Sequence, residues 1–559
     1  MESLDFPRLL QSIIEDIRSR PLTPSCGADA FANATSQSHS QGPLEEARAA
    51  VHDSIRIIER AVADAVSVIR AHEKLDIIHL RRRRNHLAPI HRLPCEILSA
   101  IFGFAADACT ERDYPKSYFP LTVLGVSYLW RQIALQSPRL WARPHTLLPR
   151  PLFETYIRRS KNASLDIFFA PKDRGQKRLD LAVYMGLVSS HAARWRSCTL
   201  NCVSPKRMAP HFQLPAPKLE ALSLNYGDMD TARDTDLSTV LLNPFSGYAP
   251  RLRELSLGGV FVPFTSPIYA NLSTLRLARI RYTKPDAFQQ LMQLLDRTPL
   301  LEVLCLDYLN FPSATNTSHS EEPLINLPLL RLLRMKTMQI DQQWVLRHIL
   351  SRVATPPSCH LELSAMLDAN DSLGSIIPQQ SNAHHLQNIA NVGSLEITCY
   401  PEMTIFEARG AKADVGGFSI TTEDYAGHAQ VLGALSCIGK AFPMPCLESL
   451  TLSWSDYEPT EVDPAVVTAF ADLLVRHPSI KELQLRHCPE LLIKSLVGTS
   501  SAPVCPNLHT LAVSDCRSLR DGTLESVVAS RRLGHIVPLS DISVRRCPNV
   551  SASTILTSI

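Results

Sequence analysis

Apolar residues in this chain recur at two spacings, and each spacing marks a different region. From Leu44 to about His86 they return every three or four residues, at Val51, Ile55, Ile58, Val62, Val66 and Ile69. This spacing places them on one face of an α-helix, and it predicts a long helix over residues 44–87. The seam covers fewer than three heptads, so it favours two arrangements equally. These are self-association through residues 44–80, or packing onto the residues that follow.

Helical spacing continues over residues 88–142. Pro94 suits the first turn of a helix, where its missing N–H costs nothing. A second apolar run extends from Leu121 to Ala134 and stops before Pro138. A segment of about 50 residues cannot bury this many large side chains alone. Either a partner or the rest of the chain must cover them.

Residues 88–142 resemble an F-box. The resemblance lies in the Leu-Pro pair, the apolar ridge and the later tryptophans: Leu93, Pro94, Ile97, Leu98, Ile101, Phe102, Val126, Trp130, Ile133, Leu140 and Trp141. In that family these positions bind a Skp-type adaptor or form the core, and the adaptor connects to the cullin scaffold of an SCF ubiquitin ligase. The polar stretch from Gly103 to Pro120 is longer than the usual connection and resembles the fungal-type F-box-like variant. The alternative is a small helical bundle that binds no adaptor.

A strand-forming repeat follows. The unit Pro-x-Leu-x-x-Leu-x-Leu occurs at Pro217–Leu224, Pro250–Leu257, Pro299–Leu306, Pro445–Leu452 and Pro478–Leu485, with weaker copies between and after them. This is the leucine-rich-repeat signature, in which the Leu-x-Leu part forms a short strand and stacked strands form one parallel sheet. We therefore expect an α/β fold: a leucine-rich-repeat solenoid preceded by a small all-α F-box-like domain and a long N-terminal helix. The strand leucines should be buried.

Other segments punctuate the repeats. Helical stretches are expected at Ala287–Arg297 and Val466–Arg476, each ended by a proline. Residues 404–421 predict an inserted hairpin, and residues 311–323 a disordered loop. A buried cysteine that serves the backbone of its turn is expected three residues after each of the last strands, at Cys488, Cys516 and Cys547.

In leucine-rich repeats the residues between the strand leucines face the concave side, where targets bind. Here they predict a target-binding surface with mixed charge: Glu254, Arg276, Asp307, Arg334, Lys336, Glu482, Gln484 and Arg486. Mixed charge favours an unidentified protein target over a polyanion. Arg334 and Lys336 lie two apart, hence on one face of a strand, and suit an acidic or phosphorylated motif. A merely solvated strand face is the equal alternative.

Composition excludes several classes. The net charge of +3 gives no field for nucleic acid, and no window resembles a membrane span or an export signal. The 14 cysteines include no Cys-x-x-Cys pair, and no catalytic motif is found, so we expect no metal, no cofactor and no enzyme activity. We expect a cytoplasmic or nuclear protein. Arg81–Arg84 reads as a solvated helix end, or as a nuclear-import or phosphate-binding patch.

The expected domains are a short helix with a disordered segment (1–43), a long helix that could be a coiled coil (44–87), an F-box-like domain (88–142) and a repeat solenoid (143–559). Two functions fit this order. One is the substrate-recognition subunit of an SCF-type E3 ubiquitin ligase. The other is a non-ligase interaction scaffold in which the F-box-like helices only cap the solenoid.

Overall fold

The structure is a computed structural model of the whole chain. It describes residues 15, 42–108, 118–146, 148–170, 179–201, 203–227, 241–312, 323–366, 373–378, 385–400, 403–412, 415–423, 435, 438, 442–454, 462–497, 504–531 and 537–551. Most of the short helix and disordered segment expected at 1–43, and most of the 311–323 loop, lie outside these residues. The chain forms two compact units, Met1–Ala108 with Tyr118–Gln136, and Cys109–Ser117 with Ser137–Ile559.

In its described residues the first unit contains only helices, as the spacing predicts: α3 (Gly42–Leu87), the 3-10 helix η1 (Pro89–Arg92), α4 (Cys95–Ala108), α5 (Phe119–Val126) and α6 (Tyr128–Gln136). Leu98 N–H donates to the Pro94 carbonyl at 3.1 Å, so Pro94 lies at the start of α4. Ser127, which is extended, separates α5 from α6, and its hydroxyl accepts from Trp130 N–H at 3.2 Å. The expected apolar run is thus two helices.

Aromatic contacts hold the helices of this unit together. The Trp130 ring of α6 lies 4.7 Å from the Phe102 ring of α4 and 6.4 Å from the His91 ring of η1, measured between centroids. The Arg82 guanidinium of α3 lies 4.4 Å above the Tyr128 ring. Arg82 is therefore more than a solvated helix end, because it fastens the last turns of α3 to α6.

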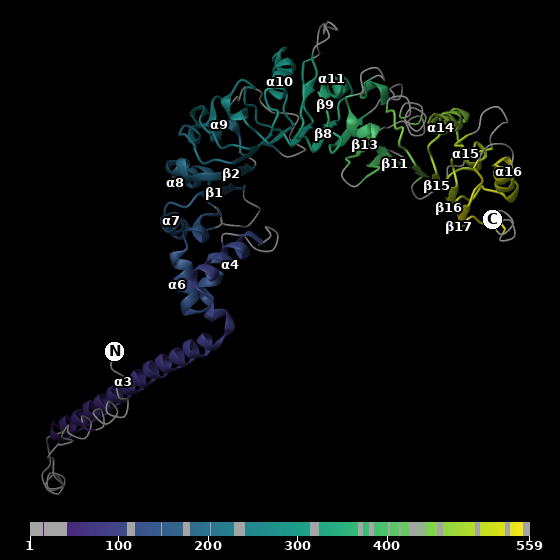
Figure 1. Cartoon of the computed structure of the whole chain (residues 1–559). Coiled ribbons are helices and arrows are strands. Elements are labelled where there is room, and N and C mark those ends of the chain that lie inside the picture. The colour runs from purple at the N-terminus through teal and green to yellow at the C-terminus, as the bar shows by residue number, and fades with distance from the viewer. Residues whose placement is uncertain are drawn as a thin grey trace. The chain divides into compact units, whose positions relative to one another are not determined.

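The second unit is built on a sheet of fifteen described strands (Figure 1). In spatial order they are β1 (Leu165–Phe169), β2 (Trp195–Asn201), β3 (Ala221–Asn225), β4 (Glu254–Gly258), β5 (Thr274–Ala278), β6 (Val303–Asp307), β8 (Leu332–Thr337), β10 (His360–Met366), β13 (Phe418–Glu423), β12 (Met403–Gly410), β11 (Val392–Cys399), β14 (Ser449–Trp454), β15 (Glu482–Arg486), β16 (Thr510–Ser514) and β17 (Asp541–Arg545). A separate pair joins β7 (Ile325–Asn326) to β9 (Val353–Ala354).

Helices connect the strands. The α-helices are α7 (Arg150–Arg159), α8 (Leu181–Val188), α9 (Pro205–Met208), α10 (Ala287–Asp296), α11 (Gln343–Arg352), α12 (Gln387–Ala390), α14 (Pro464–Arg476), α15 (Glu490–Lys494) and α16 (Asp521–Arg531). Short 3-10 helices are η3 (Pro138–Trp141), η4 (Ser189–Arg194), η5 (Ala209–His211), η7 (Pro244–Gly247), η8 (Pro267–Tyr269), η9 (Ile340–Gln342) and η10 (Leu373–Ser375). The expected helices at 287–297 and 466–476 are present as α10 and α14.

The prediction of one array of parallel strands is wrong at one place. β11, β12 and β13 form an antiparallel meander inside the array, with β13 parallel to β10 and β11 parallel to β14. After β10 the chain forms β11, which lies next to β14, and then returns through β12 to β13, which lies next to β10. The predicted hairpin at 404–421 is confirmed as β12 and β13, but it lies within the main sheet, between β10 and β11.

The strand leucines form two buried rows across the sheet. Cα partners run from Leu222 through Leu255 and Leu275 to Leu304, and from Leu224 through Leu257 and Leu277 to Leu306. The predicted burial is confirmed at Leu222, Leu224, Leu255, Leu257, Leu304, Leu306, Leu450, Leu452, Leu483 and Leu485. Since side chains alternate along a strand, the residues between these leucines share the opposite face. We call that face the polar face.

The turn after a strand repeats one backbone feature. The residue that follows the strand has a positive φ after β5, β6, β15, β16 and β17, at Arg279, Tyr308, His487, Asp515 and Arg546. After β4 the left-handed residue is Gly259, where an added Cβ would lie 2.3 Å from the Tyr226 carbonyl oxygen. His487 N–H donates to the Ser514 carbonyl at 3.0 Å, and Asp515 N–H to the Arg545 carbonyl at 2.9 Å. These bonds extend each ladder one residue beyond its strand.

The three late cysteines serve these turns, as predicted. Each is buried, and the thiols of Cys488, Cys516 and Cys547 each donate to the carbonyl two residues earlier at 3.4 Å. The Cys516 sulfur also accepts from Cys488 N–H at 3.2 Å. The side-chain hydrogen bond between Cys516 and Cys547, together with burial, raises the pKa of Cys516, so this thiol stays protonated.

Candidate functional site

The first candidate surface lies on α4, which carries two apolar stripes. Leu98, Phe102 and Ala106 are buried, and Phe102 packs against Trp130. Ile97, Ile101 and Phe104 follow at four- and three-residue spacing and are exposed, by 48%, 38% and 75%. A helix that is apolar on two sides and buries only one of them leaves apolar surface exposed to solvent, and such surface marks a candidate binding site.

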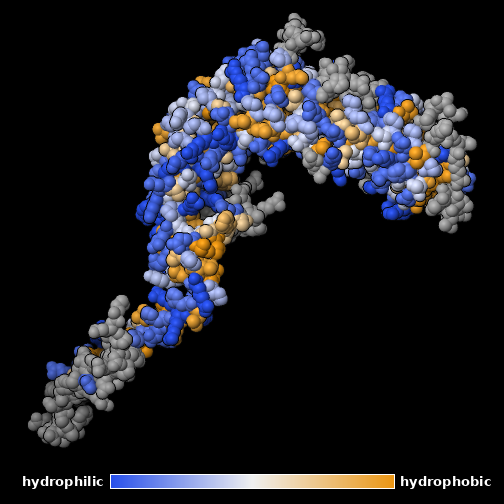
Figure 2. Space-filling view, viewed as in Figure 1, coloured by the Kyte–Doolittle hydropathy of each residue, from blue (hydrophilic) through white to orange (hydrophobic). Residues whose placement is uncertain are grey.

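The residues just before α4 extend the exposed stripe. Leu93 and Pro94 are both exposed and precede Ile97 by one helical turn. We call Leu93, Pro94, Ile97, Ile101 and Phe104 the α4 face. Figure 2 shows apolar surface gathered over α4. Phe104 was not among the residues predicted from the sequence, although the four- and three-residue spacing of Ile97, Ile101 and Phe104 indicates it.

The predicted adaptor-binding residues divide between surface and core. Leu93, Pro94, Ile97, Ile101 and Val126 are exposed and Trp130 is half-buried, whereas Leu98, Phe102 and Ile133 are core. Leu140 and Trp141 are buried in the second unit, where the Trp141 ring lies 4.9 Å from the Tyr156 ring. The boundary between the two units falls after Gln136, inside the segment expected to form the F-box-like domain (88–142), and Trp141 packs on Tyr156 of α7.

The second candidate surface is the polar face of the sheet. Every residue predicted to bind a target lies on it. Arg276, Arg334 and Gln484 occupy the row between the two leucine rows, Asp307, Lys336 and Arg486 the row after the second, and Glu254 and Glu482 the row before the first. The register thus brings together the residues of neighbouring repeats, but Gln484 and Arg486 lie several strands from Arg334.

Arg334 already has a partner on this face. Its Nη2 and Nε donate to the two carboxylate oxygens of Asp307 at 2.7 and 3.2 Å. This hydrogen bond raises the pKa of Arg334, and Lys336 is the cross-strand neighbour of Asp307. An acidic ligand at Arg334 and Lys336 would therefore compete with Asp307, which weakens the expectation of an anion site.

Three carboxylates lie in one row of the polar face at and beside the meander, and sequence reasoning did not single them out. Glu396 and Glu407 are direct cross-strand partners, and Glu362 lies two strands from Glu407 in the same row. Like charges placed opposite each other on a sheet repel. The polar face therefore changes sign along the array, from Arg276 and Arg334 to these glutamates.

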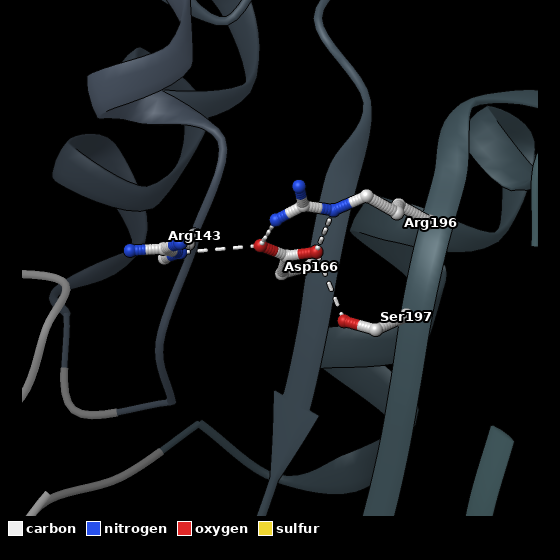
Figure 3. A network of polar contacts seen from close by, with 4 residues as sticks. All are labelled: Arg143, Asp166, Arg196 and Ser197. Atoms are coloured by element: carbon white, nitrogen blue, oxygen red, sulfur yellow. Dashed lines mark hydrogen bonds and ion pairs between the residues drawn. The ribbon is translucent and has the colours of Figure 1, made fainter. Parts of the chain in front are cut away.

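A polar network closes the β1 end of this face (Figure 3). The Asp166 carboxylate accepts from Arg196 at 2.5 and 2.9 Å, from Arg143 at 3.1 Å and from the Ser197 hydroxyl at 2.9 Å. Burial alone would raise the pKa of Asp166, but the hydrogen bond and charge of Arg196, with Arg143 and Ser197, outweigh it and lower the pKa. The carboxylate stays ionised. It links β1, which carries Asp166, to β2 through Arg196 and Ser197, and to the loop after η3 through Arg143.

The described residues contain no group of three or more His, Cys, Asp or Glu side chains able to hold a metal ion. His385 places its Nε2 2.6 Å from the Leu350 carbonyl oxygen. Among the described helices none is both long and apolar enough to cross a membrane.

No protein-family model matches the chain, and a search of curated proteins finds no relative. The candidate sites therefore stand on the residues and their geometry.

Proposed function

We propose that this chain is the substrate-recognition subunit of an SCF-type E3 ubiquitin ligase. In this proposal the helices after α3 form an F-box-like domain that docks a Skp-type adaptor. The second unit is a leucine-rich-repeat solenoid whose polar face binds a protein target. The chain supplies recognition, and catalysis belongs to the enzymes that the cullin scaffold recruits.

One observation supports adaptor docking most directly. The helix that the F-box resemblance assigns to the adaptor has a complete buried stripe and, beside it, the exposed α4 face. Large apolar side chains at the centre of an interface supply most of its binding energy. Because Leu98 and Phe102 anchor α4 through the buried stripe, substitutions on the α4 face can be made without removing its core contacts.

Target binding by the polar face has separate support. The register aligns side chains from neighbouring repeats into continuous rows, and the opposite face is filled by leucines. Rows of this kind present many side chains to one extended partner. The change of charge sign along the face favours a protein target that carries both signs.

The test measures binding of the full chain to a purified Skp-type adaptor. In the Ile97→Ala/Ile101→Ala variant, loss of two central contacts should weaken binding by about 30-fold or more, which corresponds to about 2 kcal/mol. Leu93→Ala/Pro94→Ala should act in the same direction. The matched control is Val475→Ala/Leu491→Ala, which removes two equally exposed apolar side chains from the second unit.

Undiminished adaptor binding by the Ile97/Ile101 variant would refute docking through the α4 face. If the wild-type chain copurifies neither adaptor nor cullin, the scaffold alternative replaces the ligase. Circular dichroism of each variant separates a lost contact from a lost fold.

A further inference from the structure

The helix α3 has an exposed apolar stripe for which the described residues offer no cover. Of its 46 residues, none with a described side chain is buried. Val51, Ile55, Ile58, Val62, Val66 and Ile69 are exposed by 39% to 54%. Helices in proteins derive most of their stability from packing an apolar face. A helix about 70 Å long, held at its last turns by Arg82 and Tyr128, needs a partner along this stripe.

The stripe runs straight along the helix. Its successive spacings are 4, 3, 4, 4 and 3, which sum to 18 residues in five steps, or 3.6 residues a step. This matches the turn of an undistorted α-helix, whereas a heptad seam would average 3.5. The stripe therefore suits a nearly straight pairing with another helix over about 27 Å.

A charged residue lies at each end of the stripe, and the two residues have opposite charges. Arg48 precedes Val51 by three residues, and Glu73 follows Ile69 by four, so both lie on the same helical face. Both are exposed. The midpoint between Arg48 and Glu73 coincides, to within half a residue, with the midpoint of the stripe at Arg60. The surface is therefore apolar in the centre, positive at one end and negative at the other.

We propose that α3 binds α3 of a second copy of this chain in antiparallel orientation. Pairing about Arg60 places Val51 beside Ile69 of the partner, and Ile58 beside Val62 of the partner. It also brings Arg48 to Glu73 of the partner at both ends. A parallel pair would instead bring Arg48 to Arg48 and Glu73 to Glu73, and would gather both runs of Arg81–Arg84 at one end. Charge complementarity thus selects a second copy and its direction. The inference does not depend on adaptor binding.

The experiment determines the mass of the purified full chain by light scattering after size exclusion, at micromolar concentration. The expected mass is twice that of the 62.1 kDa chain. Ile58→Lys should convert the dimer to a monomer because it places a cation at the centre of the stripe. Ile57→Lys is the matched control, since Ile57 is as exposed as Ile58 but points to another side of α3.

A charge exchange tests the direction. Arg48→Glu should weaken the dimer at least tenfold, because it sets two carboxylates against each other at both ends. Arg48→Glu combined with Glu73→Arg should restore the affinity. Arg60→Glu, on the far side of the helix, should leave it unchanged. In a parallel dimer the combined variant would give no rescue.

A wild-type monomer at tens of micromolar would overturn the proposal and assign the stripe to another part of this chain or to a different protein. A dimer that Ile58→Lys leaves intact would place the contact elsewhere. Mass measured on the Ile97→Ala/Ile101→Ala variant keeps this result separate from the adaptor experiment, because that variant should still dimerise.

Discussion

At the scale of single residues, charged side chains link neighbouring strands of the sheet in addition to the backbone ladder. Asp166 joins Arg143, Arg196 and Ser197 at the first strands of the sheet. Arg334 and Asp307 do the same between β6 and β8. The sequence predicts neither of these contacts. The repeat pattern indicates which face of the sheet a residue lies on, but not which charged side chain it contacts there.

The Asp166 network predicts a dependence of stability on pH. Its pKa in the folded chain lies below the usual value of 3.8, so its contribution is present above pH 3.8 and is lost as the pH falls through the folded value. Asp166→Asn should lower the free energy of unfolding at pH 7 by about 2 kcal/mol, because hydrogen bonds to a charged group are lost. Urea unfolding at pH 7 and at a series of pH values that descends from 4 measures this.

The difference between wild type and Asp166→Asn should shrink as the pH falls through the folded pKa of Asp166, because below that value both side chains are neutral. Asp472→Asn, which alters an exposed carboxylate on α14, should cost little at any of these pH values. A constant difference at all of these values would show that Asp166 acts through packing and not through its charge.

At the scale of elements, the sequence predicts most of what is present. Helical spacing identifies α3, and the repeat positions identify the buried leucines of β3, β4, β6, β14 and β15. On α4 the pattern marks Ile97, Leu98, Ile101 and Phe102 as one apolar ridge, but it does not say which of these residues are buried. That depends on Trp130 of α6, which packs on Phe102 and leaves Ile97 and Ile101 exposed.

The left-handed residues after the strands escape prediction for a different reason. Glycine is the usual signal for this conformation, but five of the six positions carry Arg, Tyr, His, Asp and Arg. Four of these five residues donate a backbone N–H hydrogen bond to a carbonyl of the next strand, and this hydrogen bond holds the conformation. A hydrogen bond made by the backbone does not depend on the side chain, so the sequence does not predict it.

These turns can be tested at His487. A β-branched side chain is poorly tolerated at positive φ, so His487→Val should destabilise the chain by about 1–2 kcal/mol. His487→Gly should cost less than His487→Val. Valine at the adjacent Arg486, an extended position on β15, is the matched control and should be neutral. Equal losses for the two valine variants, measured by chemical denaturation, would contradict a conformational cost at this turn.

At the scale of the whole molecule, the meander connects the two parallel parts of the sheet. The alternating pattern at 404–421 predicts a hairpin, yet it cannot predict that β11 and β13 pair with β14 and β10, because alternation specifies a face and not a neighbour. Phe406 of β12, the central strand of this meander, is fully buried beside its cross-strand partners Ile397 and Ile420.

Phe406→Ala should therefore lower stability by about 3–5 kcal/mol and divide the unfolding into two transitions. Hydrogen exchange would show β1–β10 and β14–β17 losing protection separately. Leu222→Ala, in β3, should also destabilise but should not divide the transition between these two parts. A single transition in Phe406→Ala would mean that the two parts are coupled by other contacts.

The strand directions also have a consequence for the later turns. β11, β13 and β14 all run in the direction of β10, and only β12 runs against them. The inserted meander therefore pairs with the array in parallel on both of its sides. As a result β14–β17 run in the same direction as β3–β6, and the left-handed residues after β15, β16 and β17 lie at the same edge of the sheet as those after β4, β5 and β6.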